Sequence, residues 1–170
     1  MAKRIALVGR GWRWIWDELG VEIHVSNAAA TAMKRHRQPL GGVERGGLLF
    51  VDPGHPVGVV LIRVTPPHSA DRAGEHSLIM DPARCAREIC KANLEGLRLI
   101  GFWHSHPEEV PNLSAIDISN FRSLARRNAV DLPWPVAIIV GRDHGAEGIR
   151  AWSVRPDRIY HAEWSDPVDN

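Results

Sequence analysis

Residues 101–117, GFWHSHPEEVPNLSAID, join an apolar, strand-like run to two histidines, a serine and an aspartate. Side chains two positions apart on a strand point to the same face, so His104 and His106 should share one face. Phe102 and Ile100 should lie beneath them. The proline after the pair ends the strand, which places both imidazoles where a site can open to solvent. A His-x-His pair there is a good start for a zinc site, because zinc prefers nitrogen, sulfur or carboxylate ligands in a tetrahedron.

Asp117 is the third candidate ligand. The segment from Ser114 to Asp117 is typical of a helix N-terminus in which the serine is the cap. Asp117, Phe121 and Leu124 then lie on one stripe of that helix, at positions i, i+4 and i+7. A carboxylate at the head of an apolar stripe needs a compensating charge, because burying it alone is costly. A zinc ion would supply that charge; alternatively, Asp117 only stabilises the helix dipole.

Apolar periodicity and turn residues predict a mixture of strands and helices along the rest of the chain. Helices are expected at residues 27–38, 81–96 and 114–128. Strands are expected at residues 21–26, 46–51, 57–65, 97–104, 134–140, 148–154 and 157–164, with a strand and an alternating run within 4–20. Strands that alternate with helices favour an α/β sandwich over an α+β one.

Composition limits the class of protein. The 170 residues, 44% hydrophobic and 24% charged, fit one globular domain. The net charge is +1 and no basic run interleaves with aromatic residues, so nucleic-acid binding has no support. Two cysteines do not make a disulfide framework. No stretch has the length of a membrane span or the core of a signal peptide, so no membrane contact and a cytoplasmic location are expected.

The order of these motifs resembles the JAMM signature of the MPN (Mov34/PAD-1) metalloproteases. In that family HxHP is followed by a spacer and SxxD, with a glutamate well upstream. Here residues 104–107 read HSHP, residues 114–117 read SAID, and residues 44–49 read ERGGLL, which is similar to the family's E-x-G-G-x-L. Such a multi-part match is specific. It covers about residues 20–155, with Leu113 standing where the family often has proline or alanine.

The resemblance implies a fold, a cofactor and residue roles. The implied fold is α/β of the JAB1/MPN-like (cytidine-deaminase-like) type, a mixed sheet flanked by helices. The implied cofactor is Zn²⁺ on His104, His106 and Asp117, with water as the fourth ligand. Glu44 would accept the proton of that water and return it to the leaving amine, and Ser114 would stabilise the oxyanion. On composition alone, other glutamates could be the base: Glu22, Glu75, Glu108 and Glu109.

Within this family the chain is most similar to compact bacterial JAMM proteins encoded beside E1- and E2-like ligation enzymes, in anti-phage operons of the CBASS or Bil type. The phrases GFWHSHPEEVP and VTPPHSADRAG carry this likeness. The implied function is removal of a ubiquitin-like modifier, or a protein ligated in the same way, from its target, with the E1/E2-like enzymes as partners. Two alternatives stay open: a JAMM hydrolase acting on the C-terminus of a sulfur-carrier protein, and a non-catalytic MPN scaffold.

The expected organisation is an N-terminal extension at residues 1–18, a catalytic domain at residues 19–165 and a tail at residues 166–170. Trp12, Trp14 and Trp16 in the extension share a face at period two. They are expected to be core anchors or part of a partner surface.

The segment from Pro66 to Ile79 is rich in turn residues and precedes a helix. In the resembling family the corresponding insertion lies near the cleft. We expect it to be mobile when free, with residues 75–79 (EHSLI) ordering against an extended substrate tail. The alternative is a plain surface loop.

Overall fold

The computed structural model describes residues 10–167, in which nine strands form one sheet in the order β10-β9-β8-β7-β3-β4-β2-β1-β11. The strands are β1 (Arg10–Trp16), β2 (Val21–Ser26), β3 (Gly46–Asp52), β4 (Val60–Val64), β7 (Arg98–Ser105), β8 (Val136–Val140), β9 (Ile149–Val154), β10 (Ile159–His161) and β11 (Glu163–Ser165). β2 pairs with β4, and β7 with β8, in parallel, whereas the other neighbours are antiparallel. The expected mixed α/β sheet is confirmed.

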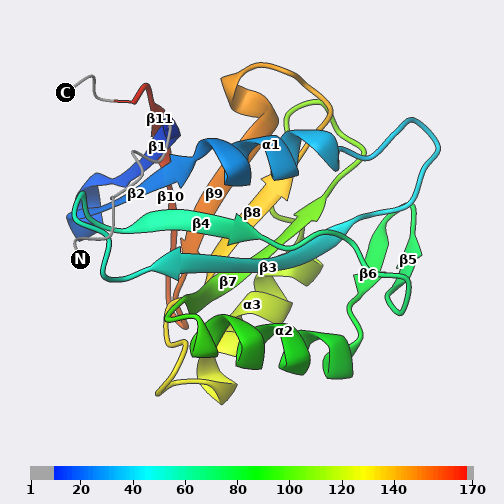
Figure 1. The fold of residues 1–170 in the computed structure, drawn as a ribbon. Helices are drawn as coiled ribbons and strands as arrows, with labels where there is room; N and C mark the ends of the chain where they lie inside the picture. Colours follow the sequence, from blue (N-terminus) through cyan, green and yellow to red (C-terminus); the bar gives the residue numbers. More distant parts are fainter. Residues whose placement is uncertain (1–9, 168–170) are drawn as a thin grey trace.

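Helices cover both faces of the sheet. α1 (Asn27–Arg35) lies on one face, and α2 (Pro82–Leu94) and α3 (Ala115–Arg127) lie on the other (Figure 1). Short 3₁₀ turns occur at η1 (Asp17–Leu19) and η2 (Ala146–Gly148). A separate hairpin of β5 (Arg72–Gly74) and β6 (Ser77–Ile79) stands beside the end where β3 begins (Figure 1). Within the described residues, none of the helices has the length and apolar character to cross a bilayer.

Side chains of the central strands are buried on both faces. Leu49 of β3 packs in the cluster under α1, whereas its neighbours Leu48 and Phe50 pack against α2. β8 alternates in the same way, and all five of its residues are buried. This two-sided burial explains why these strands are continuous apolar runs rather than alternating ones.

The N-terminal tryptophans belong to the core. Trp12, Trp14 and Trp16 of β1 are only 4%, 1% and 3% exposed and pack in the cluster under α1. The core interpretation is therefore confirmed, and these side chains do not form a partner surface. The boundary expected at residue 18 falls inside one hydrogen-bonded sheet, since β1 pairs with β2. Residues 4–9, which belong to the stretch where a strand and an alternating run were expected, lie outside the described residues.

Residues 157–164 form two short strands instead of the single strand expected. β10 pairs with β9 at one end of the sheet order, and β11 pairs with β1 at the other end. Only Ala162 separates β10 from β11, so the sheet must curl until its two ends meet. A hydrogen bond from Trp16 Nε1 to the carbonyl of Tyr160, at 3.0 Å, joins those ends.

A bulge in β7 changes one expected orientation. Leu99 and Gly101 pair with consecutive residues of β3, which leaves Ile100 without a partner. Ile100 consequently packs against the cluster under α1, whereas Phe102 lies on the opposite face, with α2 and α3. The expectation that Ile100 lies beneath the histidines is wrong, because an extra residue shifts the alternation of the strand.

A buried ion pair attaches the segment before α2 to the sheet. Arg84 of α2 is 1% exposed, and its guanidinium contacts both carboxylate oxygens of Asp71, at 2.8 and 3.1 Å. The same guanidinium donates to the carbonyl of Gly46 at 3.2 Å and contacts Glu88 at 2.8 Å. Residues 66–81 are therefore connected to the beginning of β3.

Asp71→Ala should destabilise the protein strongly, because it leaves a buried guanidinium without its main partner. Loss of one member of a buried ion pair typically lowers the free energy of unfolding by about 3–5 kcal/mol. Arg84 keeps its contact with Glu88, so we expect a loss near the lower end of this range. Urea unfolding followed by circular dichroism measures the change. Asp157→Ala, at an exposed position, is the control, and equal stability of the two variants would contradict the expected role of the pair.

Candidate metal centre and its cleft

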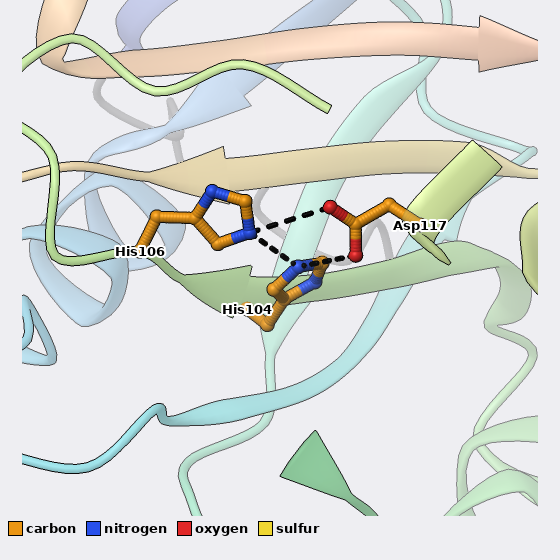
Figure 2. A group of neighbouring side chains, drawn as sticks. All are labelled: His104, His106 and Asp117. Carbon is orange, nitrogen blue, oxygen red and sulfur yellow. Dashed lines mark hydrogen bonds and ion pairs between the residues drawn. The ribbon is translucent and has the colours of Figure 1, made fainter. Parts of the chain in front are cut away.

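The three candidate ligands meet where β7 ends and α3 begins. His104 lies on β7, His106 follows the last residue of that strand, and Asp117 lies in the first turn of α3. Figure 2 shows that their side chains point toward one another. Strand and helix are brought together because Phe102 of β7 and Phe121 of α3 pack edge to face on the same side of the sheet.

The ligand atoms converge on one point. The Nε2 atoms of His104 and His106 are 3.1 Å apart. The Asp117 carboxylate reaches both rings, with Oδ1 at 3.0 Å from His104 Nε2 and Oδ2 at 3.3 Å from His106 Nε2. One ligand atom from each residue lies within 4.8 Å of the others. The structure thus brings together all three residues singled out by their sequence pattern.

This arrangement fits a tetrahedral metal ion. With a metal ion among them, two neutral imidazoles and a carboxylate would each direct a lone pair to it, which is the donor set that zinc prefers. Zinc bonds of about 2.0–2.1 Å place neighbouring ligand atoms of a tetrahedron roughly 3.3 Å apart. The two Nε2 atoms are 3.1 Å apart, and each lies 3.0–3.3 Å from a different oxygen of Asp117, which is close to that value. Glu108 contacts the other ring nitrogen of His106 at 3.3 Å and so orients that ring.

Ser114 caps α3 and also holds the candidate ligand. Its hydroxyl accepts a hydrogen bond from the Asp117 N–H at 3.1 Å and donates one to Asp117 Oδ2 at 2.7 Å. The Ser114 N–H donates to the same oxygen at 2.8 Å, which completes a capping box. The Ser114 hydroxyl therefore makes two hydrogen bonds. The same conformation of Asp117 places its carboxylate at the helix N-terminus and beside the two histidines.

Glu44 lies in the loop before β3 and lines the same cleft as the three ligands. The cleft has a volume of about 610 Å³, and Glu44 is 7% exposed. Its position follows from strand pairing, since Gly46 lies opposite His104 in the β3–β7 register. Among the other glutamates considered, Glu108 also lines the cleft, but its side chain is 57% exposed.

A family model described as prokaryotic homologs of the JAB domain matches residues 26–155. The chain belongs to this family. A protein of Pseudomonas aeruginosa (strain BWHPSA011 / Pa011) named CD-NTase/cGAS isopeptidase is 28% identical over 134 residues, which cover 76% of this chain and 84% of the relative. The protein is accordingly a JAB isopeptidase, a metal-dependent hydrolase.

The fold of this JAB domain also matches a solved structure. The solution structure of protein DSY2949 from Desulfitobacterium hafniense superposes with a TM-score of 0.59 at 23% identity. The match covers 86% of this chain and 91% of that chain. At this level of identity the likeness supports the JAB fold alone.

Apolar side chains line the JAB cleft on both sides of the ligands. β6 and the residues beside it contribute Leu78, Ile79 and Met80, and α3 contributes Ile116 and Phe121. Ile79 and Ile116 are 57% and 70% exposed, so the rim itself is apolar. Family resemblance placed residues 66–79 near the cleft, but as a mobile loop and not as the hairpin that the structure shows. The α3 side was missed, because an exposed isoleucine next to a helix cap gives no signal of its own.

Three ionisable side chains in this JAB site, those of Glu44, Asp117 and His106, have pKa values shifted from their ordinary ones. Burial raises the pKa of Glu44 to about 7, although His106 opposes the shift. Burial alone would also raise the pKa of Asp117, but hydrogen bonds from His104 and His106 outweigh it and lower that pKa. Burial would lower the pKa of His106, but its bond to Asp117 raises it. A carboxyl that titrates near neutrality is suited to exchange protons at physiological pH.

Metal-free wild-type protein should lose stability relative to Glu44→Gln as the pH rises from about 4.5 to 7. Over that window the folded state holds a proton on Glu44 that the unfolded chain has lost, so unfolding becomes easier with pH. The stability difference between the two proteins should grow by on the order of 1–3 kcal/mol in favour of the variant. Urea unfolding after chelation, at pH 5 and pH 8, measures it, with Glu163→Gln as the control. A pH-independent difference would contradict the raised pKa.

Proposed function

We propose that this protein is a zinc isopeptidase that hydrolyses the amide joining a CD-NTase, or a ubiquitin-like protein ligated in the same way, to its target. The observation that carries the proposal is the convergence of His104, His106 and Asp117 beside a buried glutamate in one open cleft. The CD-NTase/cGAS isopeptidase of Pseudomonas aeruginosa supports the substrate class. We place the reaction in the cytoplasm, with E1/E2-like ligation enzymes as the source of the conjugate.

Zinc would be held by the Nε2 atoms of His104 and His106 and by the Asp117 carboxylate. When bound, it supplies a Lewis acid and lowers the pKa of a bound water from about 15.7 to about 7. Glu44 accepts a proton from the attacking water and returns it to the leaving amine. In the metal-free protein burial raises the pKa of Glu44 to about 7, which supports its assignment as the proton carrier. The Ser114 hydroxyl, once turned from Asp117, can donate to the oxyanion, a contribution typically worth about 3 kcal/mol.

The substrate tail would lie along β6. This strand pairs with β5 alone among the described residues, so its other edge is open, and its residues line the cleft. An extended tail can add to such an edge through backbone hydrogen bonds, with side-chain pockets for selectivity. Ser77–Ile79, part of the segment expected to order on binding, already forms a strand in the hairpin. A variant in which a Gly-Ser linker replaces residues 68–75 would not test substrate binding alone. The replacement would also remove Asp71, the partner of buried Arg84.

Ile79→Asp should weaken binding of a conjugate by placing a charge on the apolar rim of the cleft. The burial of one large aliphatic side chain contributes about 1.5–3 kcal/mol, so we expect KM to rise at least tenfold with kcat little changed. Steady-state kinetics on a purified conjugate measure both constants. Leu94→Asp, on an exposed position of α2 outside the cleft, is the matched control. An equal KM for the two variants would exclude a substrate path over β6.

The proposed function is tested with a CD-NTase conjugate made by E1/E2-like ligation enzymes. Purified, zinc-loaded protein should release the intact ligated protein with a free C-terminus, as measured by mass spectrometry. Release of only a small adduct from a sulfur-carrier protein would instead favour the alternative hydrolase. Failure to cleave either substrate, with zinc bound, would favour a scaffold.

A further inference from the structure

We propose that a buried pair, Gln38 and Ser105, positions Glu44 against the metal ligands; this inference rests on the proposed role of Glu44. Gln38 and Ser105 are 1% and 0% exposed, and neither lines the cleft. They are therefore positioning residues, which act through the backbone that carries Glu44 and do not touch the substrate.

Ser105 connects the ligand strand to the base. It lies between His104 and His106, and on the opposite face of the strand from them, because side chains alternate. Its N–H donates to the carbonyl of Arg45 at 2.7 Å, and the Arg45 N–H donates to Ser105 Oγ at 2.9 Å. Both backbone groups of the residue after Glu44 are thus bonded to the residue between the two histidines.

Gln38 connects Ser105 to the loop that carries Glu44 and to the β5–β6 hairpin. Its Oε1 accepts a hydrogen bond from Ser105 Oγ at 3.3 Å. Its Nε2 donates to the carbonyl of Gly42 at 2.8 Å, just before Glu44, and to the carbonyl of Glu75 at 2.9 Å, in the turn of the hairpin. One buried amide therefore contacts the ligand strand, the loop of the base and the hairpin that borders the cleft.

The bonds close into a ring. The Glu44 N–H donates to the carbonyl of Gly74 at 2.8 Å, and Gly74 is the neighbour of Glu75, which Gln38 contacts. Residues 37–45 contain no regular helix or strand, so this ring replaces the ladder bonds that would otherwise fix the loop. An apolar side chain of the same size could fill the space, but it would leave the carbonyls of Gly42 and Glu75 without a donor.

Precise placement of Glu44 matters more for turnover than for binding. A misplacement of about 1 Å at a reacting group can cost on the order of 10²-fold in rate. The metal ligands are held separately, by the strand end and by the capping box at Ser114. Loss of the ring should therefore reduce kcat while the zinc site stays intact.

Ser105→Ala and Gln38→Met test the proposal in the zinc-loaded protein. We expect kcat on a conjugate to fall about 10- to 100-fold, with zinc content unchanged and with KM within about threefold for Ser105→Ala. Ser153→Ala, a buried serine of β9 outside the ring, is the matched control. Native kcat in Ser105→Ala, or an equal loss in Ser153→Ala, would overturn the proposal. Should Gln38→Met fail to fold, Ser105→Ala decides alone.

Hydrogen exchange gives a readout that does not depend on activity. In Ser105→Ala the amides of Glu44 and Arg45 should exchange at least tenfold faster, while those of β8 keep their wild-type rates. Unchanged exchange at these two amides would also overturn the proposal. If the wild-type protein cleaves no conjugate, the proposed function fails, and exchange still decides whether the ring holds the loop.

Discussion

Asp117→Asn should leave the protein without bound zinc and without isopeptidase activity. The carboxylate is the only charged group among the three ligands, and its amide analogue is a poor zinc ligand that cannot balance the ion's charge. Loss of a residue that hydrogen-bonds to a metal ligand typically reduces metal affinity by about 10- to 100-fold. Loss of a ligand itself should therefore reduce metal affinity by more than about 100-fold. His106→Ala should have the same effect.

Elemental analysis after gel filtration measures this loss, and conjugate cleavage is assayed on the same samples. Asp131→Asn changes an exposed aspartate outside the metal centre and serves as the control for loss of one carboxylate. Zinc at one equivalent per chain in both ligand variants would show that the ion lies elsewhere.

Glu44→Gln should separate metal binding from chemistry. Glutamine has nearly the same shape as glutamate, and the backbone bonds that hold position 44 do not involve its side chain. The variant should therefore keep its zinc and bind a conjugate with native affinity. The amide cannot accept the proton of the attacking water, so kcat should fall by about 10²–10⁴-fold.

Single-turnover cleavage and fluorescence anisotropy of a labelled conjugate measure chemistry and binding separately. Glu109→Gln is the control, because the side chain of Glu109 is 65% exposed and does not line the cleft. Glu108→Gln, which changes the other glutamate of the cleft, tests the alternative base. Near-native turnover in Glu44→Gln would exclude it as the base, and a large loss in Glu108→Gln alone would transfer that role.

The sequence by itself predicted the three candidate ligands and the fold class. His104 and His106 share a strand face, and Ser114 and Asp117 form a helix cap; both relations are local and depend only on the periods of a strand and a helix. The three helices and most strands were also predictable from local periodicity. Only family resemblance singled out Glu44, because nothing in its immediate sequence distinguishes it from the other glutamates.

Tertiary structure alone decided how these parts meet. Glu44 reaches the ligands because Gly46 pairs with His104 across strands far apart in the sequence. The bulge that turns Ile100 away also depends on that pairing. The ring through Gln38 and Ser105 and the Arg84–Asp71 pair could not be predicted either, because each joins segments whose proximity no local pattern encodes. Local sequence preferences decide where helices and strands form. Burial of their apolar faces decides how these helices and strands pack, and thereby which polar side chains come into contact.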